Sequence, residues 1–162
     1  MLPRFLLPAL LVVSLGSSPA GLMAEAPITF MQDGGWCWYQ DPRAIIADGK
    51  LVIGAVSGRT GDVKVSVYDL AAARDLGTAV LHADFQRDDH DVPAFYLRPD
   101  GRLLAMYAKH GTEKIHYLAL SAPGDFLTWE RLPSHDYPYP DGRGVTYTNL
   151  HRVENQGLLY NF

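Results

Sequence analysis

Hydrophobic residues along the chain fall into short runs separated by polar residues, and no long helical stripe follows residue 26. The runs are rich in Val, Leu, Ile, Tyr and Phe, and Gly, Asp and Pro separate them, as is typical of strands and turns. The predicted strands are residues 44–47, 51–57, 63–69, 77–82, 92–98, 102–108, 115–120, 147–153 and 158–162. The only helical candidate, residues 69–75, is short. The pattern predicts an all-β protein.

Turn residues recur at a nearly constant spacing. Asp48-Gly49, Pro99-Asp100-Gly101 and Asn155-Gln156-Gly157 each supply a residue that tolerates positive φ between two apolar runs, so three hairpins are expected. The glycines are 52 and 56 residues apart. A period near 50 residues with about four short strands per unit indicates the blades of a β-propeller, although any antiparallel protein has such turns.

The length allows only part of such a ring. A closed propeller needs about four to eight blades, and residues 27–162 supply about 2.5 blades of the seven that we expect. The last predicted strand, 158–162, also has no polar tail. Either the propeller prediction is wrong or residues 27–162 are the N-terminal part of a longer propeller domain, and we favour the second interpretation.

The first 26 residues have the pattern of a signal peptide. A basic start at Arg4 precedes an apolar run, residues 5–16 (FLLPALLVVSLG), which is too short to span a bilayer. Ala24-Glu25-Ala26 is the expected cleavage site, and Ser18-Pro19-Ala20 is a second candidate. We therefore expect a secreted or periplasmic protein without stable membrane insertion.

Charge and cysteine content narrow the function further. The formal net charge is −4, so the chain lacks the basic stripe that nucleic-acid binding requires. Cys37 is the only cysteine, so no disulfide can form within the chain, and we expect it to be a buried apolar residue.

Two histidines are the first candidates for chemistry. His90 precedes the strand at 92–98 and His110 follows the strand at 102–108, so pairing through the turn at 99–101 would bring them together at one end of the hairpin. They suit general acid–base catalysis near neutral pH, and a carboxylate such as Asp89 could fix the tautomer. No metal-ligand motif accompanies them, so neither a catalytic metal nor a cofactor is expected. The alternative is a solvated turn with surface histidines.

Other candidates would bind substrate. Arg43 begins a strand where a propeller exposes side chains to its central funnel, and it could hold a carboxylate through two hydrogen bonds or serve in a structural ion pair. Trp38 could stack on a sugar ring or pack in the core. Tyr147 is expected to begin a strand after a long loop, where functional residues concentrate.

Five ordered motifs together resemble the BNR-repeat-containing family, a sialidase-like group of secreted propellers that includes ulvan lyases and related uronate lyases. The motifs are residues 35–45 (GWCWYQDPRAI), 88–94 (DDHDVPA), 99–105 (PDGRLLA), 109–111 (KHG) and 146–149 (TYTN). The resemblance implies that His90, His110 and Tyr147 are catalytic. The family also has a substrate arginine beyond the strand at 158–162, which this chain does not contain.

The resemblance further implies a polysaccharide lyase that cleaves anionic, uronic-acid-containing glycans by β-elimination. His90 and His110 would neutralise the carboxylate or act as base, and Tyr147 would act as acid or base. Arg43, Asp89 and Trp38 would contact the substrate. A sialidase-type hydrolase, with Asp89 or Asp62 as a catalytic carboxylate, and a non-catalytic glycan-binding propeller are the alternatives.

Overall fold

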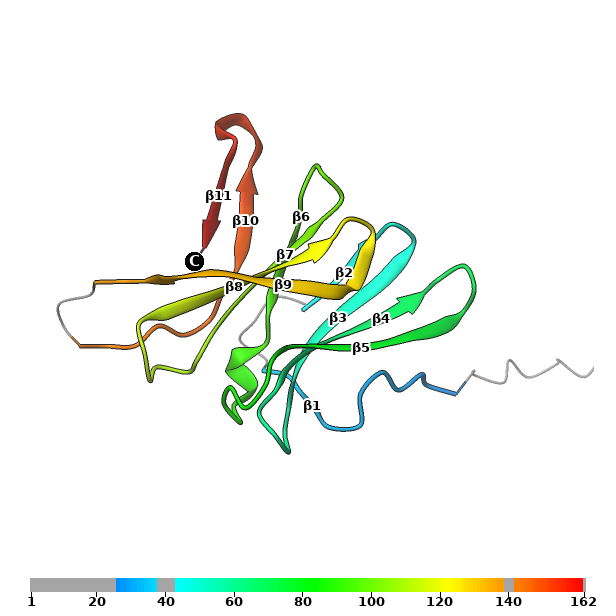
Figure 1. Ribbon diagram of the computed structural model, residues 1–162, viewed down its shortest axis with the longest axis horizontal. Coiled ribbons are helices and arrows are strands. Elements are labelled where there is room, and N and C mark those ends of the chain that lie inside the picture. Colours follow the sequence, from blue (N-terminus) through cyan, green and yellow to red (C-terminus); the bar gives the residue numbers. More distant parts are fainter. Residues whose placement is uncertain (1–25, 38–42, 139–141, 162) are drawn as a thin grey trace, which may run out of the picture.

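The computed structural model describes residues 26–37, 43–138 and 142–161. It is an all-β arrangement of one five-stranded and one four-stranded antiparallel sheet followed by a hairpin (Figure 1). Within these residues the only helical elements are two 3-10 turns, η1 (Asp89–Asp91) and η2 (Glu154–Gln156). No helix in the described part of the chain has the length and apolar character needed to cross a membrane.

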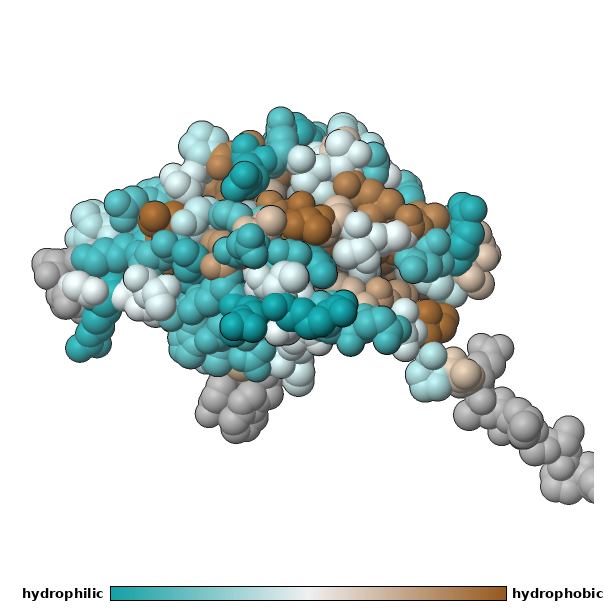
Figure 2. Space-filling view, turned by 60° about the horizontal axis from the view of Figure 1, so that its bottom comes forward, coloured by the Kyte–Doolittle hydropathy of each residue, from teal (hydrophilic) through white to brown (hydrophobic). Residues whose placement is uncertain are grey.

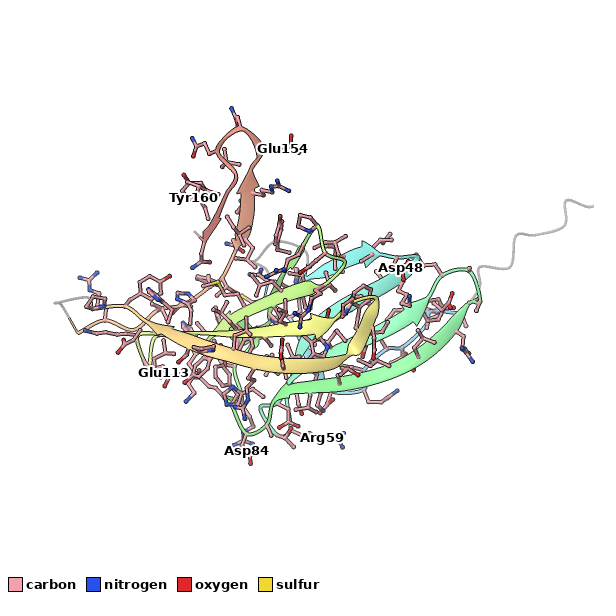
Figure 3. All side chains as sticks on the ribbon, turned by 45° about the horizontal axis from the view of Figure 1, so that its top comes forward. Asp48, Arg59, Asp84, Glu113, Glu154 and Tyr160 are labelled. Carbon is pink, nitrogen blue, oxygen red and sulfur yellow. The ribbon has the colours of Figure 1, made fainter. Side chains whose placement is uncertain are left out.

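The first sheet, blade 1, is built from sequential hairpins. Its strands are β2 (Ala44–Ala47), β3 (Lys50–Ser57), β4 (Val63–Asp69) and β5 (Arg74–His82), and the short β1 (Gly34–Gly35) pairs with the end of β3. Asp48 and Gly49 have φ of 48° and 68°, which confirms the predicted turn between β2 and β3. Figure 3 shows Asp48 and Arg59 at opposite ends of this blade.

The second sheet, blade 2, repeats this order. Its strands are β6 (Ala94–Leu97), β7 (Leu103–Ala108), β8 (Ile115–Ala122) and β9 (Asp125–Asp136). A third unit begins with the hairpin of β10 (Leu150–Val153) and β11 (Leu158–Asn161), which stands apart from the two sheets in Figure 1. Two blades and the start of a third confirm the blade pattern that the turn spacing predicted.

The two blades share one core. Valines that alternate along β3 and β4 pack in the same cluster as Leu103, Ala105 and Tyr107 of β7. The backbones also approach closely: a Cβ added at Gly54 would lie 2.8 Å from Pro93, just before β6. Gly54 thus allows the innermost strand of blade 2 to lie against blade 1.

Some large hydrophobic side chains remain on the surface. Figure 2 shows brown, hydrophobic patches among hydrophilic ones on one face. Trp36, Ile46, Val80 and Leu158 are each more than half exposed. Blades normally cover such residues by packing on the next blade of the ring.

Three sequence predictions need correction. The helical candidate at 69–75 does not form a helix: residues 70–73 are the turn between β4 and β5, where the Asp69 carboxylate accepts the backbone N–H groups of Ala71 and Ala72. The twelve-residue strand β9 was not predicted: it contains Pro133, which an outermost strand tolerates. Tyr147 does not begin a strand, since β10 starts only at Leu150.

Candidate active site

The hairpin of β6 and β7 places His90 and His110 at one end of blade 2. The register pairs Ala94 with Met106, and extending it by four residues sets His90 opposite His110, as predicted. The two rings are 3.9 Å apart between centroids and inclined by 31°. His90 itself lies in η1, not in a strand.

Asp88 holds both histidine rings. Its Oδ1 lies 2.6 Å from His90 Nδ1, and its Oδ2 lies 2.9 Å from His110 Nδ1. Asp88 also caps η1, because Oδ1 accepts the backbone N–H of His90 at 3.0 Å. The His110 backbone is fixed in turn, since its N–H donates to Gln86 Oε1 at 2.8 Å.

The charge of Asp88 defines what the imidazoles can do. Partial burial raises the pKa of its carboxyl, but hydrogen bonds from the His90 backbone and from both rings outweigh burial and lower the pKa overall. An ionised carboxylate only accepts hydrogen bonds, so each Nδ1 carries a hydrogen. In a neutral ring with its hydrogen on Nδ1, Nε2 carries the lone pair that can accept a proton.

Tyr147 completes a cluster of three rings. Its ring centroid is 5.2 Å from that of His90, at an angle of 55°. The structure therefore brings together the three residues predicted to be catalytic. His90 and Tyr147 are partly exposed and His110 is exposed, so solvent reaches the cluster.

The three predicted substrate-binding residues are placed differently. Asp89 is half exposed, and its Oδ1 lies 3.0 Å from His90 Nδ1, so it borders the cluster. Arg43 is only 5% exposed, and its Nη2 donates to Asn149 Oδ1 at 2.9 Å, so it links β2 to the segment before β10. Trp38 lies outside the described residues. Substrate contact by these residues stays a prediction.

A shallow groove lies beside Arg43. It has a volume of ≈ 330 Å³, and its walls include Phe30, Met31, Trp36 and Ile53. Within the described residues its lining is mostly apolar and does not include the two histidines. The groove and the three-ring cluster are therefore separate features.

Donor atoms suited to a metal ion also meet at the cluster. One oxygen or nitrogen each from Asp88, His90 and His110 lie within 4.8 Å of one another, as do ligand atoms of Cys37, Asp89 and His90. The hydrogen bonds to Asp88 account for the first of these groupings. Cys37 itself is buried, as expected.

Two acidic side chains at the site were not predicted from the sequence. Asp88 was overlooked as the bridging residue, although an Asp two positions before His90 is a common N-cap signal. Asp91 is fully buried, and neither of its oxygens has a hydrogen-bond partner among the described residues. Burial first, and then the charge of Asp88, raise the pKa of Asp91 to about 8.

Comparison with known proteins gives matches of two kinds. The family model described as "BNR repeat-containing family member" matches residues 37–162. Among solved structures, a PL25 ulvan lyase bound to -[GlcA(1-4)Rha3S]- aligns with a TM-score of 0.64 and 18% identity, over 82% of this chain and 34% of that chain.

A second ulvan lyase structure of the same PL25 family aligns with a TM-score of 0.63, again at 18% identity and with the same coverage. At that identity the likeness concerns the fold. The chain spans about a third of the length of these structures. No curated protein matches it in sequence.

Proposed function

The chain belongs to the BNR repeat-containing family, and from this premise we propose that the protein is a polysaccharide lyase that cleaves uronic-acid-containing glycans by β-elimination. The observation that carries the proposal is the cluster in which Asp88 bonds both His90 and His110 and the Tyr147 ring lies against His90. The fold of the PL25 ulvan lyases supports it.

The reaction needs groups that the cluster supplies. A base removes the proton from the ring carbon next to the uronate carboxylate, a carbon–carbon double bond forms, and the glycosidic carbon–oxygen bond breaks. The departing oxygen takes a proton from an acid, so protons balance without any redox partner. Neutralising the carboxylate makes the first proton more acidic.

We assign these roles to neighbouring groups of the cluster. Asp88 holds each Nδ1 as a donor, so Nε2 is the nitrogen of each ring that can accept a proton, and a protonated ring can neutralise the carboxylate. Tyr147 beside His90 supplies a hydroxyl as acid or base. Two proton-transfer groups on adjacent rings fit one sugar unit.

Three wider features belong to this proposal. The full-length protein would close the ring with further blades, seven in total, and would supply the substrate arginine beyond β11. It would be exported after removal of residues 1–26. The N-terminal sequence of protein recovered from outside the cytoplasm tests the export, because it should begin at Pro27.

The experiment incubates the full-length protein with a panel of uronate polysaccharides and follows ultraviolet absorbance of the unsaturated uronyl product. His110→Ala and Tyr147→Phe should each abolish the absorbance rise. His135→Ala is the matched control, because His135 is an exposed histidine on β9 whose ring contacts Tyr137. Activity equal to wild type in the first two variants would contradict the proposed roles.

The same panel separates the alternatives. Release of reducing sugar without ultraviolet absorbance would identify a hydrolase. Glycan binding without turnover, unchanged in His110→Ala, would identify a binding propeller. Arg43 does not favour the hydrolase, because its buried side chain already bonds Asn149 instead of standing open as a carboxylate clamp.

A further inference from the structure

The backbone of Tyr147 has an uncommon conformation. Its φ is +56°, in the left-handed region that a bulky side chain rarely adopts. Such a conformation persists only where the surroundings enforce it, and such residues gather at functional sites. The residues on either side of Tyr147 show what enforces it.

The first anchor lies on the N-terminal side, at Gly144 and Val145. Val145 accepts the backbone N–H of Gly111 at 2.9 Å and donates its own N–H to the Glu113 carbonyl at 2.8 Å. Gly144 lies directly against Gly111, since an added Cβ would come 2.2 Å from the Gly111 carbonyl. Only glycine fits this contact. Glu113 is labelled in Figure 3, in the turn between β7 and β8.

The second anchor lies on the C-terminal side, at Thr148. Its Oγ1 donates to the Met106 carbonyl of β7 at 2.9 Å, and the side chain is only 2% exposed. Both anchors therefore attach the Tyr147 segment to the strand and turn that carry His110. The Tyr147 backbone between them also lies close to the buried His116 ring.

We propose that Gly144 and Thr148 are positioning residues, which hold Tyr147 in its left-handed conformation so that its ring stays against His90. The inference rests on the proposed function, because it assigns Tyr147 a place in that reaction. This role requires no contact between either residue and the substrate. Each acts by fixing the position of Tyr147 relative to the two histidines.

The test replaces Thr148 by Val in the full-length protein, which keeps the shape and removes the donor. We expect kcat on the uronate substrate to fall at least about tenfold while KM stays within about twofold, since displacement of a proton-transfer group slows chemistry more than binding. Thr148→Ser, which restores the hydroxyl, should recover most of kcat. Thr78→Val is the matched control, because it removes a hydroxyl bonded to Ser66 in blade 1.

A second measurement does not depend on activity. With 13C-labelled histidine, the His90 ring signal reports the shielding by the Tyr147 ring, so Thr148→Val and Gly144→Ala should each shift it. Thr148→Ser and Thr78→Val should leave it in place. Thr148→Ala, which removes the donor without adding atoms, carries the test if Thr148→Val does not fold.

The outcomes separate this inference from the proposed function. An unchanged His90 signal in folded Thr148→Val, or a Ser variant that behaves like Val, would overturn the positioning role. A wild-type protein without lyase activity, in which the signal still shifts as expected, would overturn the proposed function and leave the positioning role standing.

Discussion

Asp91 allows a prediction about stability in which the structure determines both sign and size. The carboxyl is fully buried without a hydrogen-bond partner among the described residues, and its pKa rises from 3.8 to about 8. Burial is the main cause, and the charges of Asp88 and Asp89 add to it. Lys109 and the His110 backbone oppose the shift.

The sign of the pH dependence follows from whether the folded or the unfolded state binds the proton of Asp91. Between about pH 4 and pH 8 the folded protein keeps Asp91 protonated, while the unfolded chain ionises it. The folded state then binds one more proton, so this group lowers the free energy of unfolding as pH rises, by at most about 1.4 kcal/mol per pH unit. Above about pH 8 Asp91 is ionised in both states, so it lowers the free energy of unfolding no further.

Asp91→Asn removes the titration and keeps the shape. Relative to wild type, the free energy of unfolding of this variant should therefore increase by about 1 kcal/mol per pH unit between about pH 5 and pH 8. Urea unfolding of both full-length proteins across this range measures the difference. The difference in the free energy of unfolding between Asp91→Asn and wild type at a single pH is less informative, because the buried amide adds an unpaired donor.

Asp125→Asn is the control. Hydrogen bonds, first from the Thr128 side chain and then from the Leu127 backbone, lower the pKa of the Asp125 carboxyl, so its stabilising charge is lost only as pH falls below about 4. Its variant should lose a constant amount of stability between about pH 5 and pH 8. Parallel pH curves for wild type and Asp91→Asn would refute the conclusion that burial keeps Asp91 neutral.

Three further results are expected. Asp88→Asn presents an oxygen to one imidazole and an NH₂ group to the other, so one ring takes the wrong tautomer. In the ultraviolet assay kcat should fall by about 10²-fold. A kcat near wild type would mean that Asp88 does not set the tautomers. Gly54→Ala places a methyl group 2.8 Å from Pro93 and should cost about 1–3 kcal/mol, read as a lower Tm, unless the blades can move apart. Tyr107→Phe removes a buried hydroxyl that has no partner in the described part of the chain, so the free energy of unfolding should stay the same or rise by about 1 kcal/mol. A clear decrease would show that the hydroxyl has a partner.

The fold was predictable from local signals. Positive-φ turn residues such as Asp48 and Gly49 determine where hairpins form, and the register of one hairpin was enough to bring His90 and His110 together. β9 could not be recognised, because its charged residues and Pro133 suit an outermost strand but not the apolar pattern of an inner one.

The site was less predictable because its supports depend on contacts between distant segments. Nothing in the sequence around Thr148 indicates that its hydroxyl reaches Met106, 42 positions away. The hydrogen bond of buried Arg43 likewise reaches Asn149, 106 positions away. Contacts between side chains of one hairpin can be predicted from the periodicity of the sequence, whereas contacts between distant segments are known only from the structure.

The short sequence separation within the histidine pair has a consequence for how the protein folds. Asp88 and His110 are 22 positions apart, so closing this loop costs little conformational entropy compared with closing a ring of blades. Contacts of such low sequence separation form early. The contacts of the Asp88 carboxylate with both imidazoles lie within this one hairpin, so they do not depend on pairing with distant segments of the chain.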